Sequence, residues 1–271
     1  MTDESWLAAF RDVGSRIRAA TAALAGTAAA REELGRGAGG DRTVEIDRLA
    51  EATALGVLAG LAERGERFSL LSEEVGRVDH GAPYPLIVLD PIDGSVNAKT
   101  GIPVYAVMLS LVRGPTVAEV GVGYTLNLVS GEQWHAVRGG GAFRNGQRLV
   151  PQASRPGERI DVLGLESSAG SVQKSDALIR RASKLRILGC MAVSLAHTAS
   201  GAIDLFCSPI QARVFDMTAG LLMIEEVGGV ATDMAGRSLA ELEAGLERRT
   251  TVLASADREL HRRSLEVLAA G

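Results

Sequence analysis

Hydrophobic residues recur at helical spacing in the first part of the chain. Between residues 5 and 34 the apolar positions are Trp6, Phe10, Val13, Ile17, Ala20 and Leu24. A second pattern of this kind covers 46–58, and a glycine-rich run at 35–41 separates the two. Apolar residues three and four positions apart indicate a helix with one buried face. The sequence therefore predicts two amphipathic helices, the first extending over 5–34.

The period changes to that of β-strands from residue 68 onward. Short β-prone runs follow one another, each bounded by Gly, Pro or Asn: FSLLS, PLIVLD, VYAVMLSLV, VAEVGVGYTL and EQWHAV. Such runs are typical of strands. Asn145-Gly146 between two further short runs indicates a tight β-hairpin. We expect a mostly antiparallel sheet covered by the two N-terminal helices.

The second half alternates strands with helices. The runs IDVLGL, KLRIL, AIDLF, GGVAT and TVLAS are strand-like, and helical stretches are expected near 175–182, 191–200, 216–227 and 256–269. This alternation is typical of a layered α/β unit. The change of rhythm places the boundary in 150–158. It predicts an N-terminal α+β domain, 1–153, that binds metal and phosphate, and a C-terminal α/β domain, 154–271, that completes the substrate pocket.

Charge and composition argue against two kinds of partner, nucleic acids and membranes. The 271 residues carry a net charge of −4 and only 4% aromatic side chains, with no basic stripe. These features argue against a nucleic-acid partner. No apolar run approaches the ~20 residues of a membrane span, and the acidic N-terminus is unlike a signal peptide. We therefore expect a cytoplasmic protein without a membrane partner. Cys190 and Cys207 stand in apolar surroundings, where small buried thiols are the simplest interpretation.

Carboxylates follow directly on an apolar strand. The run 86–89 leads into Asp90, and Asp93 comes three residues later across a proline turn. The two side chains can point to one place, where Mg²⁺ would find the oxygen ligands that it prefers. The carbonyl of Ile92 is a further candidate ligand. Gly94 and Ser95 can open a short helix and offer free N–H groups to a phosphate.

Each acidic motif also has a simpler explanation when it is taken alone. Glu73-Glu74 is a common pattern on a solvated face, Asp216 can cap a helix, and Asp47 lies in a helical pattern where most acids are on the surface. The histidines are scattered, and surface or packing roles are expected for His80, His135, His197 and His261.

The combination of motifs is more specific than any one of them. SEEVG at 72–76, DPIDGS at 90–95 and FDMTAG at 215–220 occur in this order, together with GDRTVEID at 40–47 and GGGAFRNGQ at 139–147. In these motifs the sequence resembles the inositol monophosphatase family, which also includes archaeal-type fructose-1,6-bisphosphatases and nucleotide 3′-phosphatases. The resemblance implies an αβαβα layered sandwich of the sugar-phosphatase kind, two or three Mg²⁺ ions per site and a homodimer.

The resemblance also implies roles for the residues that match the motifs. The metal ligands are then Glu73, Asp90, Asp93, Asp216 and the carbonyl of Ile92, and Glu73 is in addition a base-like neighbour of the first metal. Asp47 and Ser95 look like the pair that orients the attacking water, with Ser95 where the family usually has Thr. Glu74 resembles the outer acid of its pair. The implied chemistry is in-line attack of a metal-bound water on a phosphate ester.

The substrate side is expected from the second half of the chain. By resemblance, Gly189, Cys190 and Met191 lie against the substrate, and Asp93 contacts it as well. Inositol-specific relatives carry an acid seven residues before the metal-binding Asp, where this chain has Pro209. Arg213 and the cations of 184–186 are candidates for binding a second phosphate. We therefore expect a small sugar, inositol or cyclitol phosphate as substrate, as in the archaeal dual-activity branch.

Two other functions stay open at this point. A phosphatase of 3′-phosphoadenosine nucleotides would need a platform for adenine, and no obvious one is visible in the sequence. A catalytically idle relative that binds a partner is disfavoured, since every expected metal ligand is present.

Overall fold

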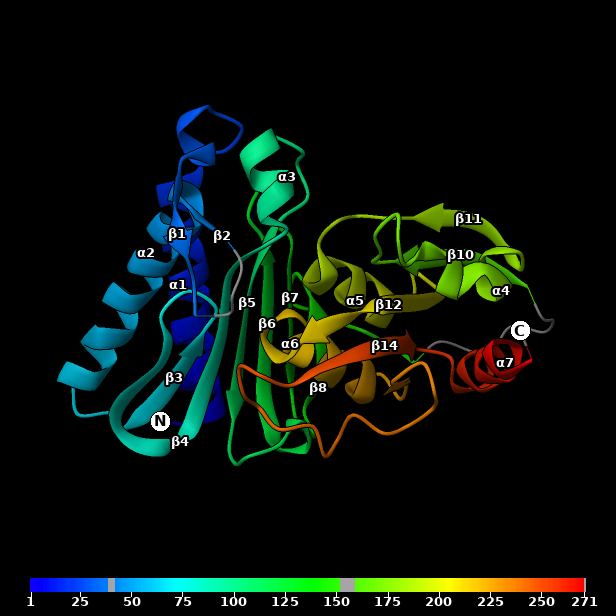
Figure 1. Ribbon diagram of the computed structural model, residues 1–271. Helices are drawn as coiled ribbons and strands as arrows, with labels where there is room; N and C mark the ends of the chain where they lie inside the picture. The colour runs from blue at the N-terminus through cyan, green and yellow to red at the C-terminus, as the bar shows by residue number, and fades with distance from the viewer. Residues whose placement is uncertain (39–41, 152–158, 271) are drawn as a thin grey trace.

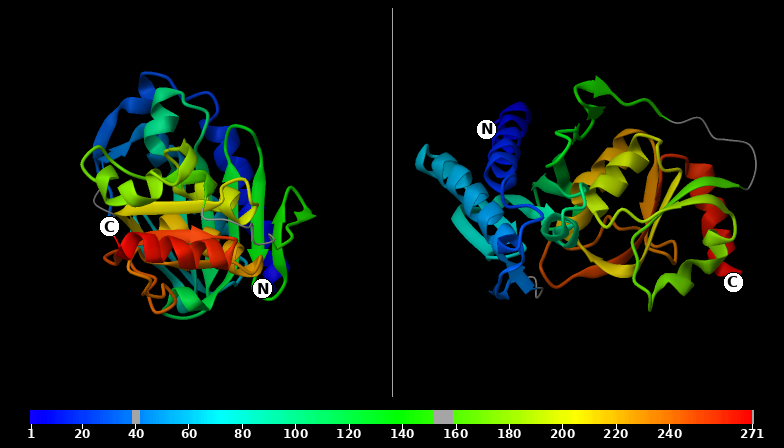
Figure 2. Two further views of the ribbon diagram at one scale, coloured as in Figure 1. Left: turned by 90° about the vertical axis from the view of Figure 1, so that its right-hand side faces the viewer. Right: turned by 90° about the horizontal axis from the view of Figure 1, so that it is seen from above.

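Five layers of helices and sheets make up the protein. The computed structural model describes residues 1–38, 42–151 and 159–270 (Figure 1). Two helices cover the outer face of a seven-stranded sheet, two more lie between it and a five-stranded sheet, and a third group covers the far side (Figure 2). This arrangement confirms the predicted αβαβα sandwich.

The first layer consists of α1 (Asp3–Thr21) and α2 (Glu45–Glu63). The prediction of one helix over 5–34 is wrong in its second half, because α1 ends at Thr21. Gly26 adopts a positive φ of 75° and donates its N–H to the Ala98 carbonyl at 2.9 Å. This long-range contact holds the chain away from a continued helix. The next elements are a short 3₁₀ turn and a two-stranded ribbon: η1 (Ala29–Arg31), β1 (Glu33–Arg36) and β2 (Arg42–Val44).

The seven-stranded sheet has its strands in sequence order. They are β3 (Phe68–Ser72), β4 (Gly76–Asp93), β5 (Ala106–Val112), β6 (Val120–Asn127), β7 (Gln133–Val137), β8 (Gly141–Arg144) and β9 (Gln147–Arg148). All neighbours pair antiparallel except β3 with β4. Asn145 and Gly146 both have positive φ between β8 and β9, as the hairpin prediction requires. Two short helices interrupt the sheet, α3 (Ser95–Thr100) and the 3₁₀ turn η2 (Val117–Glu119).

The five-stranded sheet is mixed, with the order β11-β10-β12-β14-β13. Its strands are β10 (Ile160–Leu165), β11 (Ala182–Arg186), β12 (Leu205–Arg213), β13 (Val230–Thr232) and β14 (Arg249–Ser255). Its helices are η3 (Val172–Ser175), α4 (Asp176–Ile179), α5 (Met191–Ala199), α6 (Val214–Glu226) and α7 (Arg258–Ala269). Every predicted strand is present. Most of the boundary predicted at 150–158 lies outside the described residues.

Helix α6 joins the two sheets. It contacts β4, β5, β6, β7 and β8 on one side and β12, β13 and β14 on the other, and all but three of its residues are buried. Close packing depends on Gly123 in β6, where an added Cβ would lie 2.9 Å from the Cα of Ala219. The absence of a side chain at this point lets α6 lie directly on the sheet. Its first turn, which carries Asp216, is thereby fixed against the end of β4.

Some further predictions concern single residues. Cys190 and Cys207 are buried free thiols, as expected. The four histidines have packing roles: His80, His135 and His197 contact aromatic rings, and His261 lies within hydrogen-bond distance of Thr232. None of the helices in the described ranges combines the length and apolar character of a bilayer-crossing segment.

We predict that Gly123→Val lowers the free energy of unfolding by about 1–3 kcal/mol, since the added side chain overpacks the α6 contact. The measurement is urea unfolding of the metal-free protein. Gly56→Ala is the matched control, because Gly56 lies exposed in α2 with nothing within 4 Å of an added Cβ. That variant should gain up to about 1 kcal/mol. Equal effects of the two substitutions would contradict the packing argument.

Candidate metal and phosphate site

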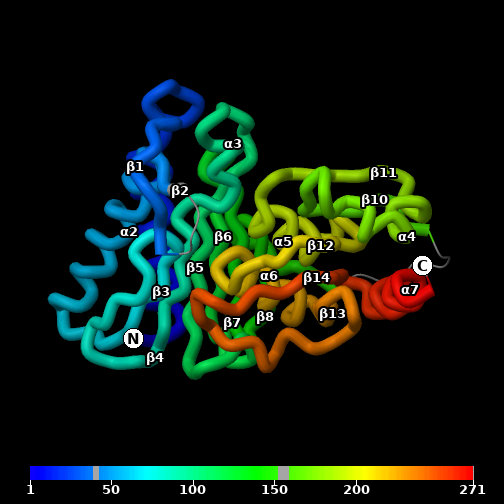
Figure 3. The backbone as a smooth tube through the Cα atoms, viewed as in Figure 1, coloured from blue at the N-terminus to red at the C-terminus, as the bar shows by residue number. Residues whose placement is uncertain are grey.

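Four carboxylates from three separated segments gather beside α6. Glu73 lies in the turn between β3 and β4, Asp90 and Asp93 lie at the end of β4, and Asp216 lies in the first turn of α6. Burial raises the pKa of Asp90 well above its ordinary value, and the charges of Glu73, Asp93 and Asp216 raise it further. Such mutual repulsion requires short separations. The chain path in Figure 3 brings these segments together at the junction of the two sheets.

The end of β4 turns both of its aspartates out of the sheet. The strand is fully buried from Leu86 and pairs with β5 up to Asp90 opposite Met108. The pairing then skips to Asp93, so the chain bulges between the two acids. Within the bulge the Ile92 N–H donates to Oδ1 of Asp90 at 3.0 Å. The bulge explains how two acids three residues apart come to face one site.

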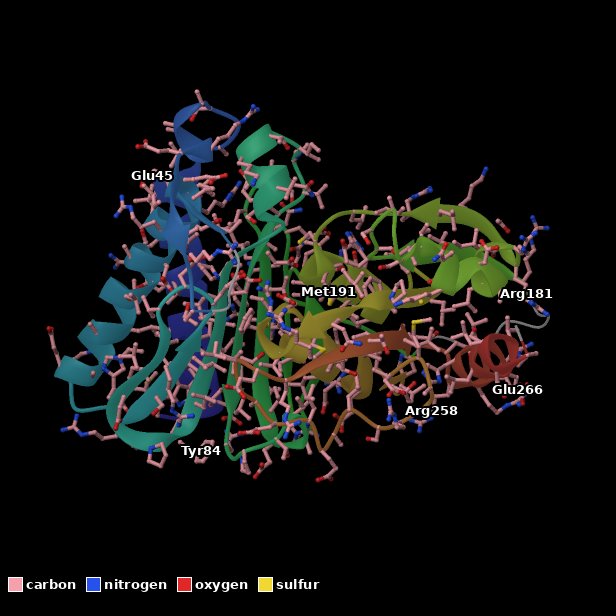
Figure 4. All side chains as sticks on the ribbon, viewed as in Figure 1. Glu45, Tyr84, Arg181, Met191, Arg258 and Glu266 are labelled. Carbon is pink, nitrogen blue, oxygen red and sulfur yellow. The ribbon has the colours of Figure 1, made fainter. Side chains whose placement is uncertain are left out.

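The start of α5 contacts Asp93. The Ala192 N–H donates to Oδ2 of Asp93 at 2.5 Å, and the Cys190 thiol donates to the same oxygen at 3.1 Å. Burial raises the pKa of Asp93, with Asp216 adding to the effect, and these hydrogen bonds oppose it. The predicted substrate segment Gly189, Cys190 and Met191 is therefore at the site (Figure 4 labels Met191). Cys190 is fully buried, and its thiol is directed to Asp93.

Arg213 is the cation among these acids. Its guanidinium lies 2.6 Å from Glu73 and 3.3 Å from Asp216, and it stacks 4.7 Å from the centre of the Phe215 ring. Burial alone would lower the pKa of Arg213, but Asp216 and Glu73 raise it above its ordinary value. Asp216 also accepts the Arg213 backbone N–H at 2.9 Å, as a residue in the first helical turn can. Asp216 therefore both caps α6 and faces the site.

A polar cavity of about 250 Å³ opens beside the carboxylates. It is lined by Asp47, Glu73, Glu74, Asp90, Ile92, Asp93, Gly94, Ser95, Val96, Lys99 and Arg213. Oδ1 of Asp47 is buried and lacks a hydrogen-bond partner in the described structure. Burial raises the pKa of Asp47 to about 7, and the charge of Glu74 contributes. The cavity thus brings together Asp47 and Ser95, which the sequence predicted as a pair.

Gly94 allows α3 to approach the α5 segment. It has a positive φ of 87°, and an added Cβ would lie 2.9 Å from the carbonyl oxygen of Gly189. Next to it, the side-chain amide of Asn97 donates to the carbonyls of Val104 and Leu188, each at 2.7 Å. These contacts fix the backbone of Gly94 and Ser95 at the edge of the cavity.

Two site residues were missed by sequence reasoning. Glu51 is buried one helical turn after Asp47 and accepts hydrogen bonds from the Ser72 hydroxyl and, at 3.1 Å, from the Val75 N–H. It thereby holds the turn that carries Glu73. Lys99 lines the cavity four residues after Ser95. The spacing of four on one helix was the available signal in both cases.

The cations predicted at 184–186 are not in the cavity lining. Lys184 and Arg186 are exposed on β11, which is an edge strand of the second sheet. Arg213 is therefore the better placed of the two candidates for a second phosphate.

The donor set suits a hard divalent cation, because all of its candidate ligands are oxygen atoms. As the side chains stand, no three His, Cys, Asp or Glu residues within 1–38, 42–151 and 159–270 are arranged to enclose a metal ion. The Arg213 guanidinium instead lies between Glu73 and Asp216. The charge and the oxygen atoms of these acids fit divalent cations, since positive charge is already the partner that the acids have.

Comparison with known proteins agrees with this geometry. The model of the inositol monophosphatase family matches residues 6–270. The chain belongs to the inositol monophosphatase family. A fructose-1,6-bisphosphatase/inositol-1-monophosphatase of Methanothermobacter thermautotrophicus is 31% identical over 94% of each chain. An inositol-1-monophosphatase of Aeropyrum pernix is 32% identical over 93% of this chain and 94% of its own.

A solved structure supports the family's fold for this chain. The extragenic suppressor protein suhB from Bartonella henselae superposes with a TM-score of 0.83 at 24% identity, over 98% of this chain and 99% of that one. At this level of identity the likeness establishes the fold, which is the same layered sandwich.

We predict that Gly94→Ala costs at least about 1 kcal/mol more in unfolding free energy than Gly139→Ala. Both glycines have positive φ, but nothing lies within 4 Å of an added Cβ at Gly139. The control therefore carries only the backbone cost, and the difference measures the clash with the Gly189 carbonyl. Urea unfolding of both variants decides the point, and equal losses would show that α3 and the α5 segment are not tightly apposed.

Proposed function

We propose that this family member is a phosphomonoesterase that hydrolyses a small sugar, inositol or cyclitol phosphate. The observation that carries the proposal is the convergence of Glu73, Asp90, Asp93 and Asp216 beside a polar cavity. Acids that lie close together away from water repel one another and destabilise the folded protein. Their presence together therefore supports a function in binding cations.

Two or three Mg²⁺ ions are the proposed cofactors. The residues that would hold them are Glu73, Asp90, Asp93, Asp216 and the carbonyl of Ile92. When bound, such ions supply a nucleophilic water at neutral pH and stabilise the charge on the leaving oxygen. The bulge at the end of β4 supports this assignment because it turns Asp90 and Asp93 toward the same side.

Asp47 and Ser95 are proposed to orient the attacking water. Oδ1 of Asp47 is buried without a partner, so it can accept a hydrogen bond from that water. The Ser95 hydroxyl can donate and accept on the same side of the cavity. Glu73 would assist as a base when it is not paired with Arg213. The charge of Glu74 raises the pKa of Asp47. The N–H groups of Gly94 and Ser95 are proposed to bind the phosphate oxygens, where charge concentrates in the transition state.

The substrate preference is proposed from Arg213 and from the relatives. The relative from Methanothermobacter thermautotrophicus carries both bisphosphatase and monophosphatase activity in its name. Arg213 is half-buried in the cavity lining, and cations bound by Glu73 and Asp216 would repel it. It would then be available to a second phosphate. Asp93 and the segment Gly189–Met191 are proposed to line the remainder of the substrate.

The remaining expectations also stand as proposals. They are two domains divided at 153/154, a homodimer built mainly from the first domain, a cytoplasmic location, and no nucleic-acid or membrane partner. Net charge and the low aromatic content support the exclusion of nucleic acid.

We predict that Asp93→Asn lowers Mg²⁺-dependent phosphate release from inositol 1-phosphate by at least about 100-fold, since a charged ligand is lost. The metal-free melting temperature should stay equal or rise, because the substitution removes a buried like charge. Glu63→Gln, at the exposed end of α2, is the control and should keep full activity. Near-normal turnover in Asp93→Asn would rule out its role as a ligand.

We predict that Arg213→Ala raises KM for fructose 1,6-bisphosphate by about 10-fold or more, because a charge-assisted bond to phosphate is lost. KM for inositol 1-phosphate should change by less than about 3-fold at saturating Mg²⁺. Arg186→Ala on β11 is the matched control and should change neither value. Similar increases for both substrates would exclude a second-phosphate role for Arg213.

A further inference from the structure

Glu166 directly follows β10, which has β11 and β12 on its two sides in the five-stranded sheet. β10 runs parallel to β12 with Leu165 opposite Cys207, and the Glu166 N–H donates to the Cys207 carbonyl at 3.1 Å. Its backbone is therefore one strand away from the segment that leads into Arg213 and Asp216. Small ligands of layered α/β proteins bind outside the carboxyl ends of such strands. Glu166 stands at such a strand end.

The side chain of Glu166 is poorly satisfied by the protein. Its Oε2 atom is buried and has no hydrogen-bond partner within the described ranges. Burial raises the pKa of Glu166 to about 7, and the charges of Asp93 and Asp216 add to the effect. A buried acceptor without a donor costs free energy. A ligand that brings a hydrogen-bond donor to this oxygen removes that cost.

The neighbours of Glu166 place it on one particular side of the site. Asp47, on the side of the proposed water, is influenced by Glu74, whereas Glu166 is influenced by Asp93 and Asp216. In-line displacement puts the attacking water and the leaving oxygen on opposite sides of phosphorus. Asp47 is proposed for the water, whereas Glu166 belongs with Asp93, which the α5 segment contacts. Asp93 and that segment are the part of the site proposed above to line the alcohol.

We propose that Glu166 binds a hydroxyl group of the alcohol part of the substrate and so selects esters of polyols. The inference rests on the proposed phosphomonoesterase function and extends it to the choice of substrate. A ring or chain hydroxyl donates a hydrogen bond to the unpartnered oxygen of Glu166. An ester without hydroxyls leaves this oxygen unpaired, and sites of this kind discriminate strongly against such analogues.

The test compares two phosphate esters that differ only in their hydroxyl groups, myo-inositol 1-phosphate and cyclohexyl phosphate, at saturating Mg²⁺. Glu166→Leu should lower kcat/KM for the inositol ester by about 10- to 100-fold. Its kcat/KM for cyclohexyl phosphate should change by less than about 3-fold. Asp161→Asn, at an exposed position of the same strand, is the matched control and should change neither value.

A second measurement separates a substrate contact from a structural role. Glu166→Gln keeps the shape and removes the charge, so the metal-free melting temperature should rise by about 2–4 °C. A lower melting temperature would make Glu166 a structural residue and overturn the proposal. Equal loss on both esters, or a higher Mg²⁺ concentration for half-maximal rate, would overturn it as well. If the unaltered protein releases phosphate from neither ester, the phosphomonoesterase function fails, and this inference with it.

Discussion

Repulsion among buried and half-buried carboxylates is the constraint on which the site depends. Asp90 is 1% exposed and feels the charges of Glu73, Asp93 and Asp216. Acids in such a place must be protonated or must be compensated by cations. Arg213 provides the compensation from within the chain, through Glu73 and Asp216. The negative charge of the acids favours any cation at this place. Their oxygen atoms favour hard divalent cations in particular.

The fold brings the acids of this cluster together from separate segments of the chain. The acids come from a turn between two strands, from the bulge at the end of β4 and from the first turn of α6. Other polar groups then hold each segment in place. Glu51 binds the turn that carries Glu73, and Asn97 connects α3 to the segment before α5. The apolar layers position the segments, and buried hydrogen bonds fix their relative orientation.

The strands were predictable from the sequence because their patterns are local, and the acidic site residues because their motifs are specific. The apolar run before Asp90 and the period changes predicted the strands. Long-range contacts account for what was missed. The Ala-rich stretch after Thr21 favours helix, but the bond from Gly26 to Ala98 ends it. Arg213 was expected to face substrate only. Its pairing with Glu73 joins the two halves of the chain, and no local pattern indicates such a contact.

The wedged position of α6 makes the spacing of the acids a property of the whole molecule. Asp216 is carried by this helix, and Asp90 is carried by the first sheet, on which the helix lies directly. The distance between the two carboxylates is therefore set by how closely α6 approaches Gly123. A substitution that lifts α6 off the first sheet would change the spacing of the acids without touching a single acidic side chain.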